Sequence, residues 1–147
     1  MVEDIWAGYV TSEEAAQAAA TADLIPSGTY EGTVLQATSD LNDQGDSPLY
    51  GKPVANCRVE LYEVNGKTRT TFFRATSVDI RDAQGKLFSA TKLGHQLAKA
   101  TGTLGKPFDA TLQAAQETRL RYRVGLLPER DGYEARNAVF AISPCRG

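Results

Sequence analysis

A hairpin signal in the middle of the chain constrains the fold more than any other feature. Residues 54–64 alternate apolar and polar side chains, a pattern typical of a half-buried β-strand. Asn65-Gly66 follows, and this dipeptide favours the two-residue type I′ turn that joins antiparallel strands. Residues 67–75 continue as a second strand, in which Phe72 and Phe73 fall on opposite faces. One of these two rings should therefore point away from the core.

Other elements are expected around this hairpin. Apolar residues at helical spacing predict a helix over residues 87–101, with Gly102 as its stop. Residues 109–117 fit either a short helix capped by Asp109 or part of a strand, and the polar residues 39–53 fit a long loop. Alternating patterns predict three more strands, over residues 29–37, 118–127 and 133–142. In the last of these, Val139 is expected on one face, with Phe140 and Ile142 on the other.

The order of these elements favours a mainly β fold. Three strands, one helix and two strands is the order of the OB fold, a five-stranded Greek-key barrel with a helix between strands 3 and 4. An open α+β sheet is the alternative, because element order does not prove closure. Thr11 and Glu14 have capping-box spacing, so residues 11–23 are expected to add a short N-terminal helix. We therefore divide the chain into an acidic tail, 1–23, and an OB-fold-like domain, 24–147.

Composition excludes several classes of protein. A chain of 147 residues is long enough for one domain with its own core. It contains neither an apolar run of membrane-spanning length nor a secretory leader, so we expect a cytoplasmic protein with no membrane partner. Two separated cysteines, Cys57 and Cys145, and one histidine, His95, do not make a zinc site. There is no Walker loop and no nucleophile elbow, so we expect no enzyme, no cofactor and no metal.

The charges are distributed unevenly behind a net charge of −2. Residues 1–50 contain nine acids and no lysine or arginine, whereas residues 51–125 contain thirteen bases and six acids. An acidic protein can therefore still present a local basic surface to a polyanion. Trp6 and Tyr9 in the acidic region either dock on the domain or contact a partner.

Basic and aromatic residues alternate within the basic region. The sharpest feature is Arg119, Arg121 and Arg123, because a spacing of two places all three side chains on one face of a strand. A positive surface with exposed aromatic rings is what single-stranded nucleic acid requires. The candidate binding residues are Lys52, Arg58, Tyr62, Lys67, Arg69, Phe72, Phe73, Arg74, Arg119, Arg121, Arg123 and Arg136.

Residues 24–142 resemble the OB-fold single-stranded DNA-binding proteins of tailed bacteriophages. The resemblance rests on Leu24-Ile-Pro-Ser-Gly-Thr-Tyr30, on Gly85-Lys86 before a helix containing Lys92-Leu-Gly-His-Gln-Leu-Ala-Lys-Ala-Thr-Gly102, and on Gly132-Tyr-Glu-Ala-Arg-Asn-Ala-Val139. It implies a viral protein that coats single-stranded DNA without sequence preference during DNA replication or recombination, in the host cytoplasm. Replication or recombination proteins would then be further partners, and self-association stays open.

A second function stays open beside DNA binding. The chain could be a structural or adaptor protein of a virion or replisome, in which the barrel is a protein-interaction scaffold. A charged row such as Arg119–Arg123 also protects an edge strand against aggregation. Ion pairs between these arginines and the acids of residues 31–46 would favour the scaffold. A face shared with Lys67 and Arg69 would favour DNA.

Overall fold

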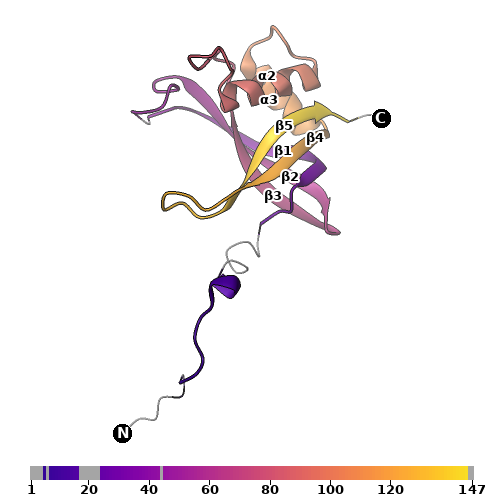
Figure 1. Ribbon diagram of the computed structural model, residues 1–147. Helices are drawn as coiled ribbons and strands as arrows, with labels where there is room; N and C mark the ends of the chain where they lie inside the picture. Colours follow the sequence, from indigo (N-terminus) through magenta and orange to yellow (C-terminus); the bar gives the residue numbers. More distant parts are fainter. Residues whose placement is uncertain (1–4, 6, 17–23, 44, 146–147) are drawn as a thin grey trace.

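The domain is built from five antiparallel strands and two helices in the part of the chain that the structure describes (Figure 1). The structure is a computed structural model that describes residues 5, 7–16, 24–43 and 45–145. Its elements are β1 (Gly28–Leu41), β2 (Pro53–Val64), β3 (Lys67–Ala75), α2 (Ser89–Thr101), α3 (Phe108–Glu117), β4 (Leu120–Leu127) and β5 (Arg136–Pro144). The strands form one sheet in the order β3-β2-β1-β4-β5.

The β2–β3 hairpin is confirmed. Asn65 and Gly66 have φ angles of 52° and 77°, the two positive values that a type I′ turn requires. Val64 pairs with Lys67 across the turn, and the ladder continues to Ala55 and Ala75. The predicted loop is shorter than residues 39–53, because β1 extends to Leu41 and β2 begins at Pro53.

Strand β1 is the centre of the sheet and pairs on both sides. Residues 28–32 pair with β4, and residues 32–41 pair with β2. Gly32 belongs to both ladders, opposite Leu61 on one side and Leu120 on the other. A Cβ atom at this position would overlap the carbonyl oxygen of Glu60, so only glycine fits where the two ladders meet.

The expected barrel is not closed. Strands β3 and β5 are the sheet edges, and no ladder joins them within the described residues. Helix α2 contacts both edges instead. On the β5 side, the Ile142 amide donates to Gln96 Oε1 at 2.8 Å. Just after β3, the Thr76 amide donates to the Ala90 carbonyl at 3.0 Å. The helix thus satisfies amides at both edges and helps to shield them from pairing with another chain.

Residues 109–117 form a helix, which settles the alternative between helix and strand. Two helices, α2 and α3, therefore separate β3 from β4 in the sequence, where a single one is expected. In the tail, residues 13–16 form one helical turn, and Ser12 Oγ accepts from the Ala15 amide at 3.1 Å. Ser12 rather than Thr11 therefore occupies the capping position. The rest of the predicted tail helix, residues 17–23, lies outside the described residues.

Hydrogen bonds join the segment before β1 to the last strand, β5. Ile25 is 1% exposed, and its amide donates to Asn137 Oδ1 at 2.8 Å. The Asn137 Nδ2 atom donates back to the Ile25 carbonyl at 2.7 Å. This reciprocal pair holds the segment before β1 against the beginning of β5 and closes the main core at that point.

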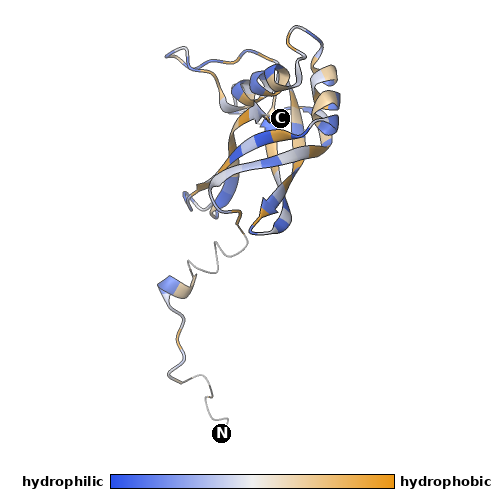
Figure 2. Cartoon of the chain, turned by 90° about the vertical axis from the view of Figure 1, so that its right-hand side faces the viewer, coloured by the Kyte–Doolittle hydropathy of each residue, from blue (hydrophilic) through white to orange (hydrophobic). Residues whose placement is uncertain are grey.

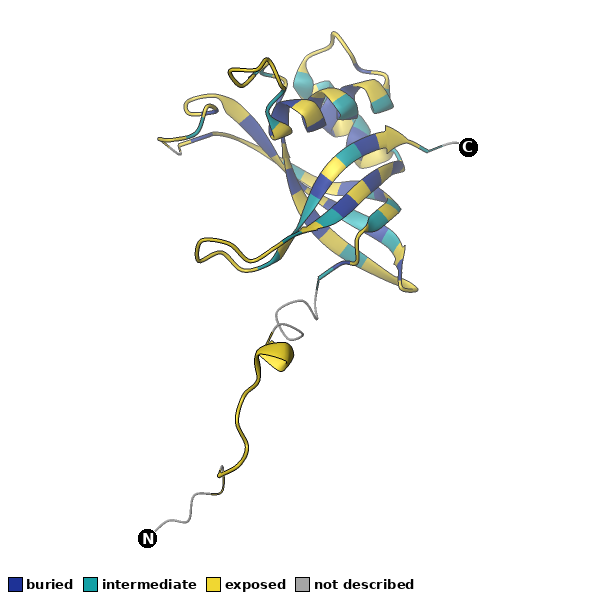
Figure 3. Cartoon of the chain, in the orientation of Figure 1, coloured by how far each residue is buried: buried dark blue, intermediate teal, exposed yellow. Residues whose placement is uncertain are grey.

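The core lies between the inner face of the sheet and the two helices. Figure 2 shows hydrophobic and hydrophilic residues alternating along the strands, and Figure 3 shows the matching alternation of buried and exposed residues. Leu93, Leu97 and Leu112 from the helices meet Val59, Leu61 and Tyr122 from the sheet. The sheet therefore keeps its other face available for solvent and ligands.

Tyr122 is an exception within this core. Its side chain is fully buried, and its hydroxyl has no hydrogen-bond partner among the described residues. Burial raises the pKa of Tyr122. An unpartnered buried hydroxyl costs about 1–3 kcal/mol.

We therefore expect Tyr122→Phe to be at least as stable as the wild type, with a gain of about 1 kcal/mol because the substitution removes only this hydroxyl. Urea unfolding followed by circular dichroism measures the change. A loss of stability would mean that the hydroxyl is hydrogen-bonded in solution and would contradict the expectation.

Candidate nucleic-acid interface

The paired phenylalanines of β3 lie on opposite faces, as predicted. Phe73 is 5% exposed and lies in the core, with its ring centroid 5.9 Å from that of Tyr122. Phe72 is 65% exposed on the outward face. Of the two candidates, only Phe72 is thus placed where a base could stack on it.

Two arginines flank Phe72 on the outward face. Arg58 of β2 is its direct cross-strand partner. Arg74 lies two residues further along β3, on the same face and opposite Asn56. Both arginines are exposed. We call Arg58, Phe72 and Arg74 the Phe72 patch, an exposed ring with one arginine beside it on β2 and one further along β3.

The arginine row, with Arg119 just before β4 and Arg121 and Arg123 within it, is also exposed on the outward face. Arg119, Arg121 and Arg123 alternate with the buried Leu120, Tyr122 and Val124, as predicted. Arg121 lies opposite Glu31 in the β1–β4 ladder, and Arg123 lies opposite Thr29. A carboxylate thus sits beside the row and offsets part of its repulsion.

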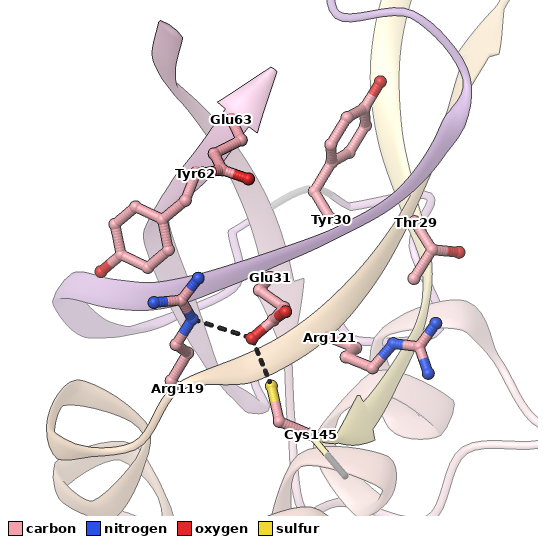
Figure 4. A pocket seen from close by; sticks show the side chains of 8 residues that line it. All are labelled: Thr29, Tyr30, Glu31, Tyr62, Glu63, Arg119, Arg121 and Cys145. Atoms are coloured by element: carbon pink, nitrogen blue, oxygen red, sulfur yellow. Dashed lines mark hydrogen bonds and ion pairs between the residues drawn. The ribbon is translucent and has the colours of Figure 1, made fainter. Parts of the chain in front are cut away.

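Arg119 is engaged by two neighbours. Its Nε lies 2.9 Å from Glu31 Oε1, and its guanidinium carbon lies 4.6 Å from the centroid of the Tyr62 ring (Figure 4). The Tyr62 hydroxyl donates to Thr33 Oγ1 at 3.0 Å. Tyr62 therefore has intramolecular contacts at its ring and at its hydroxyl, which leaves it less available than Phe72 for stacking. We call Glu31, Tyr62 and Arg119 the Glu31 cluster.

The Glu31 cluster lines an open pocket of about 410 Å³. Arg121, Glu63 and Cys145 also line it, so the pocket contains two acids and two arginines.

The Cys145 thiol donates to Glu31 Oε1 at 3.4 Å. Desolvation, the hydrogen bond and the charge of Glu31 raise the pKa of Cys145, and burial raises the pKa of Cys57 to about 12. Both thiols thus favour the protonated form, which is poorly nucleophilic.

A neutral and acidic strip separates the Phe72 patch from the Glu31 cluster. Thr33, Glu60 and Thr70 lie across β1, β2 and β3 at this level. Arg69 does not join the outward face, because it pairs with Leu61 and shares the inward side with Thr71 and Phe73. The predicted basic residues therefore do not form one continuous surface.

The remaining candidates lie at the ends of strands. Lys67 begins β3 after the hairpin turn, and Lys52 lies in the loop before β2. Arg136 begins β5, with its guanidinium carbon 5.7 Å from the Tyr133 ring centroid. Tyr133 is 68% exposed and is absent from the predicted set. Its place beside a Gly132 turn is the signal that could have indicated this exposure.

His95 lies on α2 and contacts its own helix. His95 is exposed, and its Nδ1 donates to the Thr91 carbonyl at 2.8 Å within α2. Among the residues that the structure describes, no group of three or more His, Cys, Asp or Glu side chains is placed to hold a metal ion. No helix in that part of the chain is both long enough and apolar enough to cross a membrane.

Comparison with protein families, with curated proteins and with solved structures finds no significant match to this chain. The case for a function therefore rests on the residues and geometry described above.

Proposed function

We propose that this protein binds single-stranded DNA without sequence preference, through the outward face of β2 and β3. The observation that carries the proposal is Phe72, a ring that is 65% exposed on the same face as its neighbours Arg58 and Arg74. A base can stack on this exposed ring whatever its identity, because every base has a π-face. The two arginines would contact phosphates on either side of the stacked base.

The arrangement of the strands supports this proposal. We propose that the domain is an open form of the OB fold, with α2 filling the place of the missing ladder between β3 and β5. In OB folds the β2–β3 surface and the neighbouring loops bind oligonucleotides. The exposed Tyr50 lies in the β1–β2 loop and the exposed Tyr133 in the β4–β5 loop, so both loops carry a further ring.

The biological setting is part of the same proposal. A protein of this kind would coat the single strand during phage replication or recombination in the host cytoplasm. It would need no cofactor and would catalyse no reaction, because stacking and phosphate contacts are sufficient for its role.

The Arg119–Glu31 ion pair favours a second candidate function. This pair joins the arginine row to the acidic block of residues 31–46, and it reduces the positive charge available to a polyanion. The row would then belong to a scaffold that binds other proteins of a virion or replisome. The two functions differ in whether single-stranded DNA binds at the Phe72 patch.

The salt dependence of binding tests the proposed role of the patch. For single strands, the slope of log K against log salt is about −0.7 for each phosphate contact. We expect Arg74→Ala to weaken binding to oligo-dT and to reduce the steepness of that slope by about 0.7, because one contact is lost. Fluorescence anisotropy at several salt concentrations measures both quantities.

Lys106→Ala is the matched control, because Lys106 is exposed and lies in the α2–α3 loop away from the patch. It removes the same net charge and should leave the slope almost unchanged. Equal effects of the two substitutions would mean that only the overall charge of the protein matters, and would contradict a contact at Arg74.

A further inference from the structure

A second surface lies on the side of the domain where α2 begins beside β5 (Figure 1). A groove of about 390 Å³ has an apolar floor that includes Phe88, Leu93, Val139 and Phe140. The exposed Lys86 and Lys92 also line it. The groove thus combines an apolar floor with positive charge at its margin, which fits a peptide with both apolar and acidic residues.

Asp82, the one acidic residue that lines the groove, accepts two backbone hydrogen bonds. Asp82 Oδ1 accepts from the amides of Gln84 and Lys86, both at 2.9 Å. These bonds hold the turn before α2. With two lysines against one aspartate, the lining of the groove is net positive, which favours an incoming acidic peptide.

The N-terminal segment of the chain has the complementary composition. Residues 1–10, Met-Val-Glu-Asp-Ile-Trp-Ala-Gly-Tyr-Val, contain two acids, no base and several large apolar side chains. Among those that the structure describes, Ile5, Tyr9 and Val10 are 74%, 78% and 88% exposed. These three apolar side chains are thus available for contact with another apolar surface.

We propose that residues 1–10 of one copy of the chain bind the groove between α2 and β5 of a second copy. Trp6 and its apolar neighbours would cover the floor, and Glu3 and Asp4 would face Lys86 and Lys92. The contact joins two different surfaces, so after one contact the first copy still has a free groove and the second copy still has a free segment. Association therefore continues head to tail beyond a dimer, or closes into a ring. The inference does not depend on the proposed binding of DNA.

Trp6 is the single tryptophan of the chain and reports directly on this contact. The experiment uses the full-length protein without DNA, over a range of protein concentrations. We expect the Trp6 emission to shift to shorter wavelength as the concentration rises, and sedimentation velocity to show species larger than the monomer over the same range. A monomer at every concentration would overturn the proposal. A short-wavelength emission that is independent of concentration would also overturn it, since the segment would then bind within its own chain.

Charge reversal tests the groove itself. Lys86→Glu combined with Lys92→Glu should weaken association about tenfold, because two attractions become repulsions at a solvent-exposed margin. Glu3→Lys combined with Asp4→Lys should weaken it similarly, and mixing the two double variants should restore it. Lys106→Glu, in the α2–α3 loop, is the control and should associate like the wild type. Wild-type association by the groove variant, or no recovery on mixing, would place the contact elsewhere.

Discussion

Replacing Phe72 with alanine should weaken binding to single-stranded DNA by about 1–3 kcal/mol, or about thirty-fold at the middle of that range. The ring is 65% exposed, so its removal takes little from the core. We expect the stability of the variant to stay within about 0.5 kcal/mol of the wild type. A titration of labelled oligo-dT with each protein measures the affinity, and urea unfolding confirms the fold.

Two further substitutions at Phe72 separate stacking from apolar contact. Phe72→Tyr keeps the ring and should bind like the wild type. Phe72→Leu keeps an apolar side chain without a π-face and should resemble Phe72→Ala. Wild-type affinity in both the alanine and leucine variants would show that no base stacks here, and would move the interface away from the Phe72 patch.

Replacing Gly94 with alanine should destabilise the protein, because it disturbs the position of α2. Gly94 is buried where the helix crosses the end of β3, and a Cβ atom there would overlap the carbonyl oxygen of Thr76. In a helix, alanine is more favourable than glycine by about 1 kcal/mol, so helix propensity alone predicts that Gly94→Ala is stabilising. The overlap is with backbone, which cannot rotate away. We therefore expect a net destabilisation of about 2 kcal/mol, measured by urea unfolding.

Gly45→Ala is the matched control for this prediction. Gly45 lies in the β1–β2 loop, its φ angle is not in the left-handed region, and a Cβ atom there meets nothing within 4 Å. The substitution should be neutral or stabilise by a few tenths of a kcal/mol, because it restricts only the unfolded chain. If Gly94→Ala behaved like Gly45→Ala, α2 would not be held against the Thr76 backbone as described.

Elements with a clear period could be predicted from the sequence because local pattern determines them. The β2–β3 hairpin follows from eleven alternating residues and an Asn-Gly dipeptide, which is strongly preferred in type I′ turns. The arginine row follows from strand geometry alone. Residues 109–117 remained ambiguous because their buried residues, Thr111, Leu112 and Ala115, are too few to distinguish a ten-residue helix from a strand.

Features that depend on residues far apart in the sequence could not be predicted from the local pattern of apolar and polar residues. The ladder between β4 and β5 shifts register between Arg123, opposite Ala141, and Val124, opposite Val139. Val139 and Ile142 are therefore both buried, while Phe140 is 38% exposed. Simple alternation places Phe140 and Ile142 together, which is wrong. Similarly, the ion pair of Arg119 with Glu31 joins residues 88 positions apart, and only the β1–β4 pairing brings them together.

A single titration decides whether this domain binds single-stranded DNA. The wild-type protein is added to a labelled oligo-dT of about 30 nucleotides, long enough for one to several binding sites, and in parallel to a duplex of equal length, at low and at moderate salt. We predict tight binding to the single strand, weaker binding to the duplex and a marked loss of affinity as salt increases. If the protein did not bind the single strand even at low salt, the proposed DNA-binding function would be wrong, and the protein scaffold would be favoured.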